Sequence, residues 1–174
     1  MPAHPVPIDL HLGADALVDV LILQWRTPVL ENGGKIPAPI AASKGRLLEQ
    51  LNNWLIQDFE ARVPPRPLFV LAPELSMPNG CDDLLKGIVA GMHRPAVFIA
   101  GLEFLLWQEY RVIVQQLPHM PPNPDIWLQG GHDGDVVNAA VIWVRDEVGQ
   151  VRKYVCGKPG TSPAPTVSRG WPGS

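Results

Sequence analysis

Residues 68–78 read Leu-Phe-Val-Leu-Ala-Pro-Glu-Leu-Ser-Met-Pro. The run 68–71 is continuously apolar, which is typical of a strand covered on both faces of a sheet. Glu74 follows this run directly, and α/β enzymes commonly place functional groups at the carboxyl ends of strands. Burial raises the pKa of a carboxylate and suits it to proton transfer. We therefore expect Glu74 at the edge of a sheet, partly desolvated.

Strand and helix patterns alternate on both sides of this stretch. We expect strands over 18–24, 68–71, 96–103 and 136–145, helices over 44–60 and 81–92, and a return strand over 150–155 after a turn at 146–149. Ser43 is the expected N-cap of the first helix. Residues 104–117 fit either a helix or a strand. This order indicates an α/β layer fold with a mixed sheet.

The composition is that of one globular domain. The chain has 174 residues, of which 46% are hydrophobic and 18% are charged. The net charge of −3 and the lack of a basic cluster disfavour nucleic acid as a partner. The apolar runs are too short to cross a bilayer, and the N-terminus does not have the pattern of a signal peptide. We therefore expect a cytoplasmic protein without a membrane partner.

A series of short motifs matches one family in order and spacing. The motifs are a first strand ending in Gln24, Trp54-Leu55, 71–75, 98–101, 137–142 and a hairpin that leads to Tyr154 and Lys158-Pro159. Over roughly 18–159 the chain resembles the nitrilase, or carbon–nitrogen hydrolase, superfamily. The resemblance implies a partial α-β-β-α sandwich and a Glu-Lys-Cys catalytic set acting on a small amide or nitrile. In that set the Cys attacks carbon, the Glu is the general base and acid, and the Lys stabilises the developing charge.

The resemblance carries over to two residues of this chain. By position Glu74 would be the general base and Lys158 the family lysine. Lys153 remains a rival for the lysine role, because the family lysine usually follows a Tyr by two residues and Tyr154 lies between the two candidates. The resemblance implies no cofactor and no metal.

The chain departs from the family after Lys158. The family nucleophile lies well downstream of the lysine, but the remaining 16 residues contain no Cys and no acid. We interpret 1–17 as a flexible leader, 18–159 as the N-terminal part of a hydrolase domain, and 160–174 as an irregular tail that reflects truncation or a frameshift. As given, the chain is expected to be inactive.

The alternative interpretation is a non-catalytic one. A half sandwich leaves a sheet face without its opposing layer, and an exposed apolar face favours association. The chain would then be a pseudoenzyme fragment that acts as an interaction or assembly module, with self-association into a homo-oligomer.

The remaining chemical residues favour ordinary roles. Cys156 shares a strand with Lys158 and is interpreted as a plain strand cysteine rather than a substitute nucleophile. Cys81 is expected at a helix N-terminus as a free, moderately reactive thiol. The polar stretch 130–135 contains His132 and two Asp residues but lacks the donor number and spacing of a metal site, so we interpret it as a loop.

Overall fold

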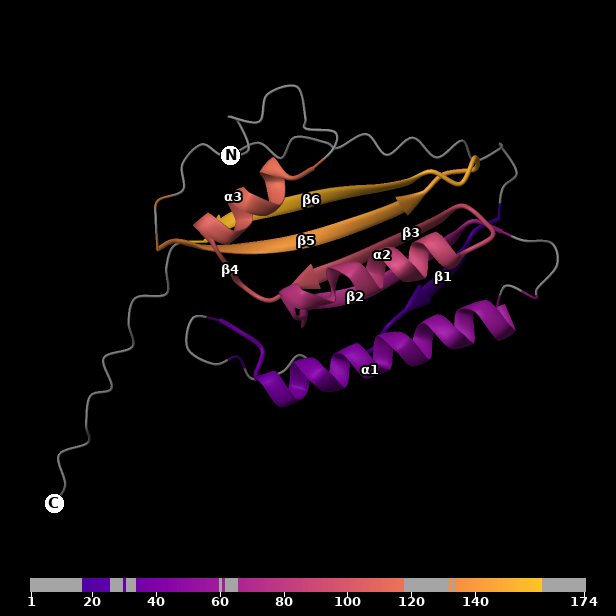
Figure 1. Cartoon of the computed structure of the whole chain (residues 1–174), viewed down its shortest axis with the longest axis horizontal. Helices are drawn as coiled ribbons and strands as arrows, with labels where there is room; N and C mark the ends of the chain where they lie inside the picture. The colour runs from indigo at the N-terminus through magenta and orange to yellow at the C-terminus, as the bar shows by residue number, and fades with distance from the viewer. Residues whose placement is uncertain are drawn as a thin grey trace, which may run out of the picture.

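The chain folds into a single mixed sheet with helices packed on it (Figure 1). The computed structural model describes residues 17–25, 30, 34–59, 61, 66–117, 132 and 134–160. Residues 158–160 are described by their backbone alone. The strands are β1 (Asp19–Ile22), β2 (Leu68–Met77), β3 (Ala96–Leu102), β4 (Leu105–Leu106), β5 (Val136–Arg145) and β6 (Val151–Gly160). The α-helices are α1 (Ala38–Trp54), α2 (Asp82–Gly91) and α3 (Trp107–Gln115).

The sheet has a parallel half and an antiparallel half. Strands β1, β2 and β3 are parallel neighbours, and α1 and α2 provide the crossovers between them. Strand β5 runs antiparallel to β3 and pairs with both β4 and β6. The predicted α/β class with a mixed sheet is therefore confirmed.

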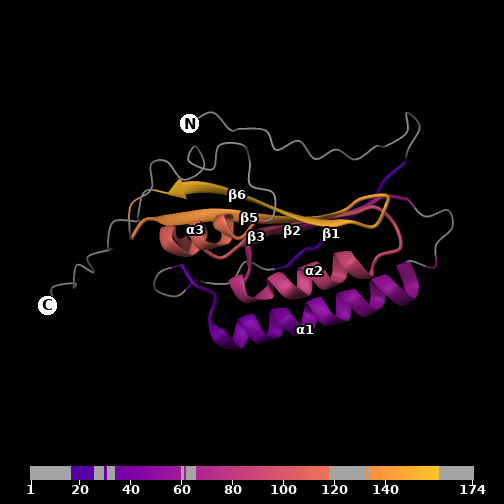
Figure 2. The same cartoon turned by 45° about the horizontal axis from the view of Figure 1, so that its top comes forward.

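All three helices contribute to one buried core on one side of the sheet (Figure 2). The sheet side chains of this core include Leu68, Val70 and Phe98, all almost fully buried. Trp143 on β5 donates from Nε1 to Asp82 of α2 at 2.9 Å, so the side of the sheet that carries Trp143 is the one that the helices cover. Strand residues alternate between faces, so the intervening residues lie on the opposite side.

That opposite side is referred to below as the uncovered face. It carries Val20, Ile22, Phe69, Leu71, Ile99, Asn138, Ala140, Ile142, Arg152, Tyr154 and Cys156. These side chains are exposed or partly exposed, and no described helix packs on them. Val97 of β3 and Val144 of β5 belong to the same face and are only 2% and 5% exposed. Among the described elements, none covers 68–71 on this face, where Phe69 and Leu71 are partly exposed.

Several predicted elements match closely. Strands β3 and β5 and helix α2 lie within two residues of their expected positions, and the hairpin turn is present, with Gly149 at φ +86°. The Asp146 carboxylate closes this turn by accepting from the backbone N–H groups of Val148 and Gln150. The open segment 104–117 divides into the short β4 and the helix α3.

Other boundaries differ. Helix α1 begins at Ala38, so Ser43 is not its N-cap, and Pro39 lies in the first turn, where its missing N–H needs no partner. The α-helix gives way to a π-helical turn over Leu55–Phe59. Strand β1 is shorter than expected, whereas β2 and β6 continue to Met77 and Gly160.

The proline-rich stretch 118–124 and nearly all of the leader and of the tail lie outside the described residues. Among the helices that the structure describes, none is long and apolar enough to cross a membrane.

Candidate functional site

The candidate site begins at an irregularity in β2. The pairing of β2 with β3 shifts register between Ala72 and Met77. A Cβ added to Gly101 of β3 would lie 2.5 Å from the Cα atom of Glu74 and 2.8 Å from the carbonyl oxygen of Pro73. The backbone of 73–75 therefore passes directly over Gly101, on the side of the uncovered face.

The backbone next to Glu74 is strained. Leu75 has φ +54°, a left-handed conformation that is uncommon for a residue other than glycine. The buried Ser76 hydroxyl donates to the carbonyl oxygen of Pro73 at 2.6 Å and so ties the two ends of this turn together. Strained backbone that is held in place in this way is often found at functional sites.

Glu74 is held by a strand two places away in the sheet. Asn138 of β5 donates from Nδ2 to Oε1 of Glu74. The glycine at position 101 makes this contact possible, because β3 lies between the two strands and carries no side chain there. Asn138 is the only amide in an otherwise apolar part of β5, and this polar break in the strand is the signal for a site residue that the sequence analysis did not assign.

Lys158 lies at the register position opposite Asn138 on β6. Directly opposed residues of an antiparallel pair share a face and lie close together. The fold therefore brings the two predicted site positions, Glu74 and Lys158, to either side of one asparagine.

The rival lysine lies on the other side of the sheet. The Nζ atom of Lys153 is 2.5 Å from Oδ2 of Asp82 and 5.6 Å from the centroid of the Trp143 ring, both on the helix-covered side. Lys153 and Lys158 are five residues apart, and an odd separation along a strand places them on opposite faces. Of the two lysine positions, only 158 shares a face with Asn138.

The environment of Glu74 differs from the expected one. Its side chain is exposed rather than partly desolvated. The reason is that the bend in 73–75 carries Glu74 onto the uncovered face, whereas a regular strand end beneath the helices would have buried it.

A second group of ionisable residues lies on the helix-covered side, around Cys81. Burial and the nearby charge of Glu103 raise the pKa of the Cys81 thiol, and Lys44 acts in the opposite direction. Cys81 is almost completely buried, so the expected reactive thiol is wrong. Glu103 has a structural role, because its carboxylate accepts from the backbone N–H groups of Ile36 at 2.6 Å and Asn79 at 3.1 Å.

Cys156 lies on the uncovered face, two residues before Lys158. It is half-buried, and burial raises the pKa of its thiol. Because the thiolate is the nucleophilic form, this raised pKa makes the Cys156 thiol less nucleophilic than that of an exposed cysteine.

Metal binding finds no support in the described part of the chain, which contains no group of three His, Cys, Asp or Glu side chains able to hold an ion. The Asp135 carboxylate accepts from the backbone N–H of His132 at 2.8 Å, as in an ordinary polar turn. Much of the stretch 130–135 lies outside the described residues.

The chain was compared with known proteins at three levels. No protein family model, no curated protein and no solved structure matches it.

Proposed function

We propose that Glu74, Asn138 and Lys158 form the acid–base and charge-stabilising part of a carbon–nitrogen hydrolase site of the nitrilase type. The observation that carries this proposal is the Glu74–Asn138 hydrogen bond on the uncovered face, with Lys158 in register opposite Asn138. In the nitrilase-type α-β-β-α sandwich, a second sheet would pack on this face and enclose the site.

Each residue has a definite part in such a reaction. A thiol adds to the carbonyl carbon of an amide, and the Glu74 carboxylate accepts the thiol proton. Lys158 stabilises the negative charge that develops on the carbonyl oxygen. Glu74 then donates its proton to the departing amine, and the carbon–nitrogen bond breaks to leave a thioester. Asn138 holds the carboxylate in one orientation through these steps.

The chain contains no suitable nucleophile for this reaction. Cys81 is buried on the opposite side of the sheet, and burial raises the pKa of Cys156. We therefore expect the 174-residue chain to release no ammonia from amides or nitriles by itself. Turnover by the purified chain that Glu74→Gln abolishes would contradict this expectation.

An added thiol provides a positive test of the proposed site. A small thiol in excess should attack an activated anilide about tenfold faster in the presence of the protein than in buffer. This factor is smaller than the one that positioned acid–base groups contribute in an enclosed site, because the proposed site is open on one side. The measurement is the release of the aniline, followed by its absorbance.

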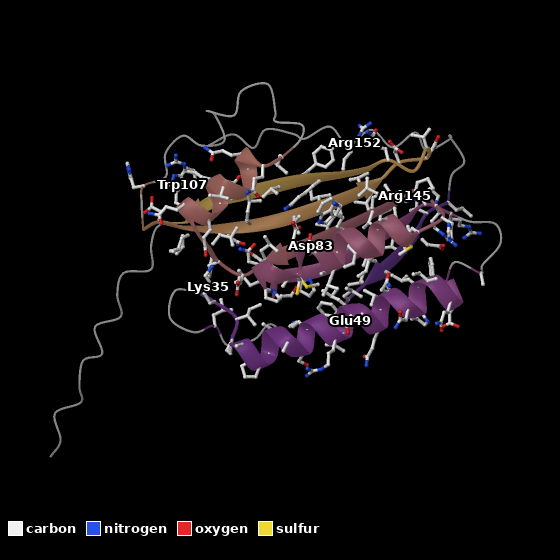
Figure 3. The ribbon with its side chains drawn as sticks, viewed as in Figure 1. Lys35, Glu49, Asp83, Trp107, Arg145 and Arg152 are labelled. Atoms are coloured by element: carbon white, nitrogen blue, oxygen red, sulfur yellow. The ribbon has the colours of Figure 1, made fainter. Side chains whose placement is uncertain are left out.

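Matched variants assign any acceleration to the site. Glu74→Gln and Lys158→Met should each return the rate to that in buffer. Glu49→Gln, which changes an exposed carboxylate on α1 (Figure 3), should leave the acceleration unchanged. No acceleration by the wild-type protein, or an equal loss in all three variants, would refute the proposed chemistry.

A second candidate function is that of a non-catalytic assembly module. The observation that favours it is the apolar character of the uncovered face, where Val20 and Ile22 are more than half exposed. Surfaces of this kind commonly mark sites of protein association.

A further inference from the structure

The part of β2 that carries Glu74 is not paired with its neighbour. Strand β2 pairs with β3 up to Ala72 and again at Met77, so residues 73–76 stand opposite Gly101 alone. These four residues are called the Glu74 bulge below. A bulge bends its strand and re-aims the side chains that it carries. The position of the Glu74 carboxylate therefore depends on how the two ends of the bulge are held.

Glu103 holds the carboxyl-terminal end of the Glu74 bulge. Its backbone N–H donates to the carbonyl oxygen of Met77 at 2.7 Å, and its Oε1 atom accepts from the backbone N–H of Asn79 at 3.1 Å. Glu103 is only 8% exposed, so water competes little for these bonds. Hydrogen bonds to a charged acceptor are stronger than those between neutral groups. The carboxylate is therefore a firm anchor for 77–79.

The second carboxylate oxygen connects this anchor to the helix layer. Oε2 of Glu103 accepts from the backbone N–H of Ile36 at 2.6 Å. The next residue, Phe104, donates its backbone N–H to the carbonyl oxygen of Gly34 at 3.2 Å. Gly34 and Ile36 lie directly before α1, which packs in the core through Leu48. The end of the bulge is thus held against an element outside the sheet.

We infer that Glu103 is a positioning residue for Glu74. By holding 77–79 in place, it fixes the bulge from which the Glu74 carboxylate reaches Asn138. This inference deepens the proposed hydrolase function and rests on it for the chemical role of Glu74. Strained backbone persists only where surrounding contacts hold it, and the left-handed Leu75 lies inside the bulge. Without the Glu103 carboxylate the bulge relaxes, and the contact with Asn138 is lost.

Position 79 allows this anchor to be removed with a matched control. Asn79 begins a short helical turn after Pro78, whose ψ of 147° suits a following proline. Because proline is tolerated at the first position of a helix, Asn79→Pro removes the N–H that Glu103 accepts and keeps the backbone conformation allowed. Asn79→Ala retains this N–H and is the control. Glu103→Gln is the second variant, since its side chain has an acceptor at only one of the two terminal atoms.

The measurement is the side-chain amide signal of Asn138 in the nuclear magnetic resonance spectrum of the full chain. Asn79→Pro and Glu103→Gln should each shift this signal to its position in Glu74→Ala, which lacks the acceptor. Asn79→Ala should leave the signal at its wild-type position. Glu109→Gln should also leave it there, because it removes a carboxylate that accepts a backbone N–H elsewhere in the fold. A Glu103 carboxylate with only a structural role would not move the signal either.

The rate of thiol attack separates this inference from the hydrolase chemistry. Asn79→Pro should reduce the about tenfold acceleration to the rate in buffer, whereas Asn79→Ala should retain it. Circular dichroism checks that each variant is folded, and either Asn79→Pro or Glu103→Gln suffices for the test. An unshifted Asn138 signal in the folded variant, or an equal shift in Asn79→Ala, overturns the inference. If the signal shifts as expected but the wild-type protein gives no acceleration, the positioning of Glu74 by Glu103 is supported and the proposed chemistry fails.

Discussion

At the scale of single residues, the candidate site depends on one glycine. Gly101 has no Cβ, so the backbone of Glu74 can pass over it and the Glu74 carboxylate can reach Asn138. The strain at Leu75 belongs to the same local arrangement. A small residue in β3 thus determines the position of an acid on β2.

Substitution of this glycine should be costly. Gly101→Ala places a methyl group 2.5 Å from backbone, so β2 or β3 must shift, and we expect the free energy of unfolding to fall by about 2–3 kcal/mol. The measurement is chemical denaturation followed by circular dichroism. The acceleration of thiol attack by the protein should disappear in the same variant, because Glu74 moves.

Gly87→Ala is the matched control. Gly87 lies within α2 and has no atom within 4 Å of an added Cβ, so alanine should stabilise the protein by about 0.5–1 kcal/mol. Equal effects of the two substitutions would show that the close approach at Gly101 has no energetic consequence.

At the scale of elements, the start of α3 is fixed by one carboxylate. Glu109 accepts from Nζ of Lys35 at 2.7 Å and from the backbone N–H of Leu106 at 2.8 Å. Burial acts to raise the pKa of Glu109, but these hydrogen bonds and the charge of Lys35 outweigh it, so the pKa is lowered. Lys35 lies before α1 (Figure 3), so the pair links two helices that are distant in the sequence.

This pair should make a pH-dependent contribution to stability. A carboxylate with a lowered pKa stabilises the fold above its ordinary pKa of 4.5, and the contribution is lost as pH falls through the folded value. Glu109→Gln should therefore cost under about 1 kcal/mol at neutral pH, because the pair is partly exposed, and progressively less below pH 4.5. Denaturation at several pH values measures this difference.

Lys35→Met removes the other partner of the pair. The difference in the free energy of unfolding between this variant and the wild-type protein should therefore also shrink as the pH falls. A difference between the wild type and Glu109→Gln that stays constant from neutral to acidic pH would contradict the assignment.

At the scale of the whole molecule, Arg94 connects segments from three parts of the chain. Its guanidinium donates to the carbonyl oxygens of Phe59 at 3.1 Å and Arg66 at 3.2 Å, and it lies 3.5 Å from the Asp19 carboxylate. Arg94 therefore links the end of the first helical segment, the approach to β2 and the start of β1.

Removal of this buried cation should destabilise the whole fold. Arg94→Ala leaves two carbonyl groups and a carboxylate without their partner, and we expect a loss of about 3 kcal/mol in the free energy of unfolding. Arg46→Ala, at an exposed position of α1, should change it by less than about 0.5 kcal/mol. Similar denaturation midpoints for the two variants would disprove this role of Arg94.

The sequence analysis predicted the regular elements better than their surroundings. Strand β5 and helix α2 have clear periodicity and were placed within a residue or two. The predicted start of the first helix at residue 44 is six residues too late, because Pro39 interrupts the helical pattern of the sequence, although proline is well tolerated in the first turn of a helix. The extension of β2 past Glu74 could not be predicted, since it depends on the close approach to Gly101.

The sequence by itself determined the α/β class, the order of the elements and the position of Glu74 after an apolar strand, because these follow from local periodicity. Only the tertiary structure decided which face the helices cover, the Glu74–Asn138 contact, and that Lys158 rather than Lys153 shares a face with Asn138. The physical reason is that these features depend on strand pairing between residues far apart in the sequence, which local patterns do not encode.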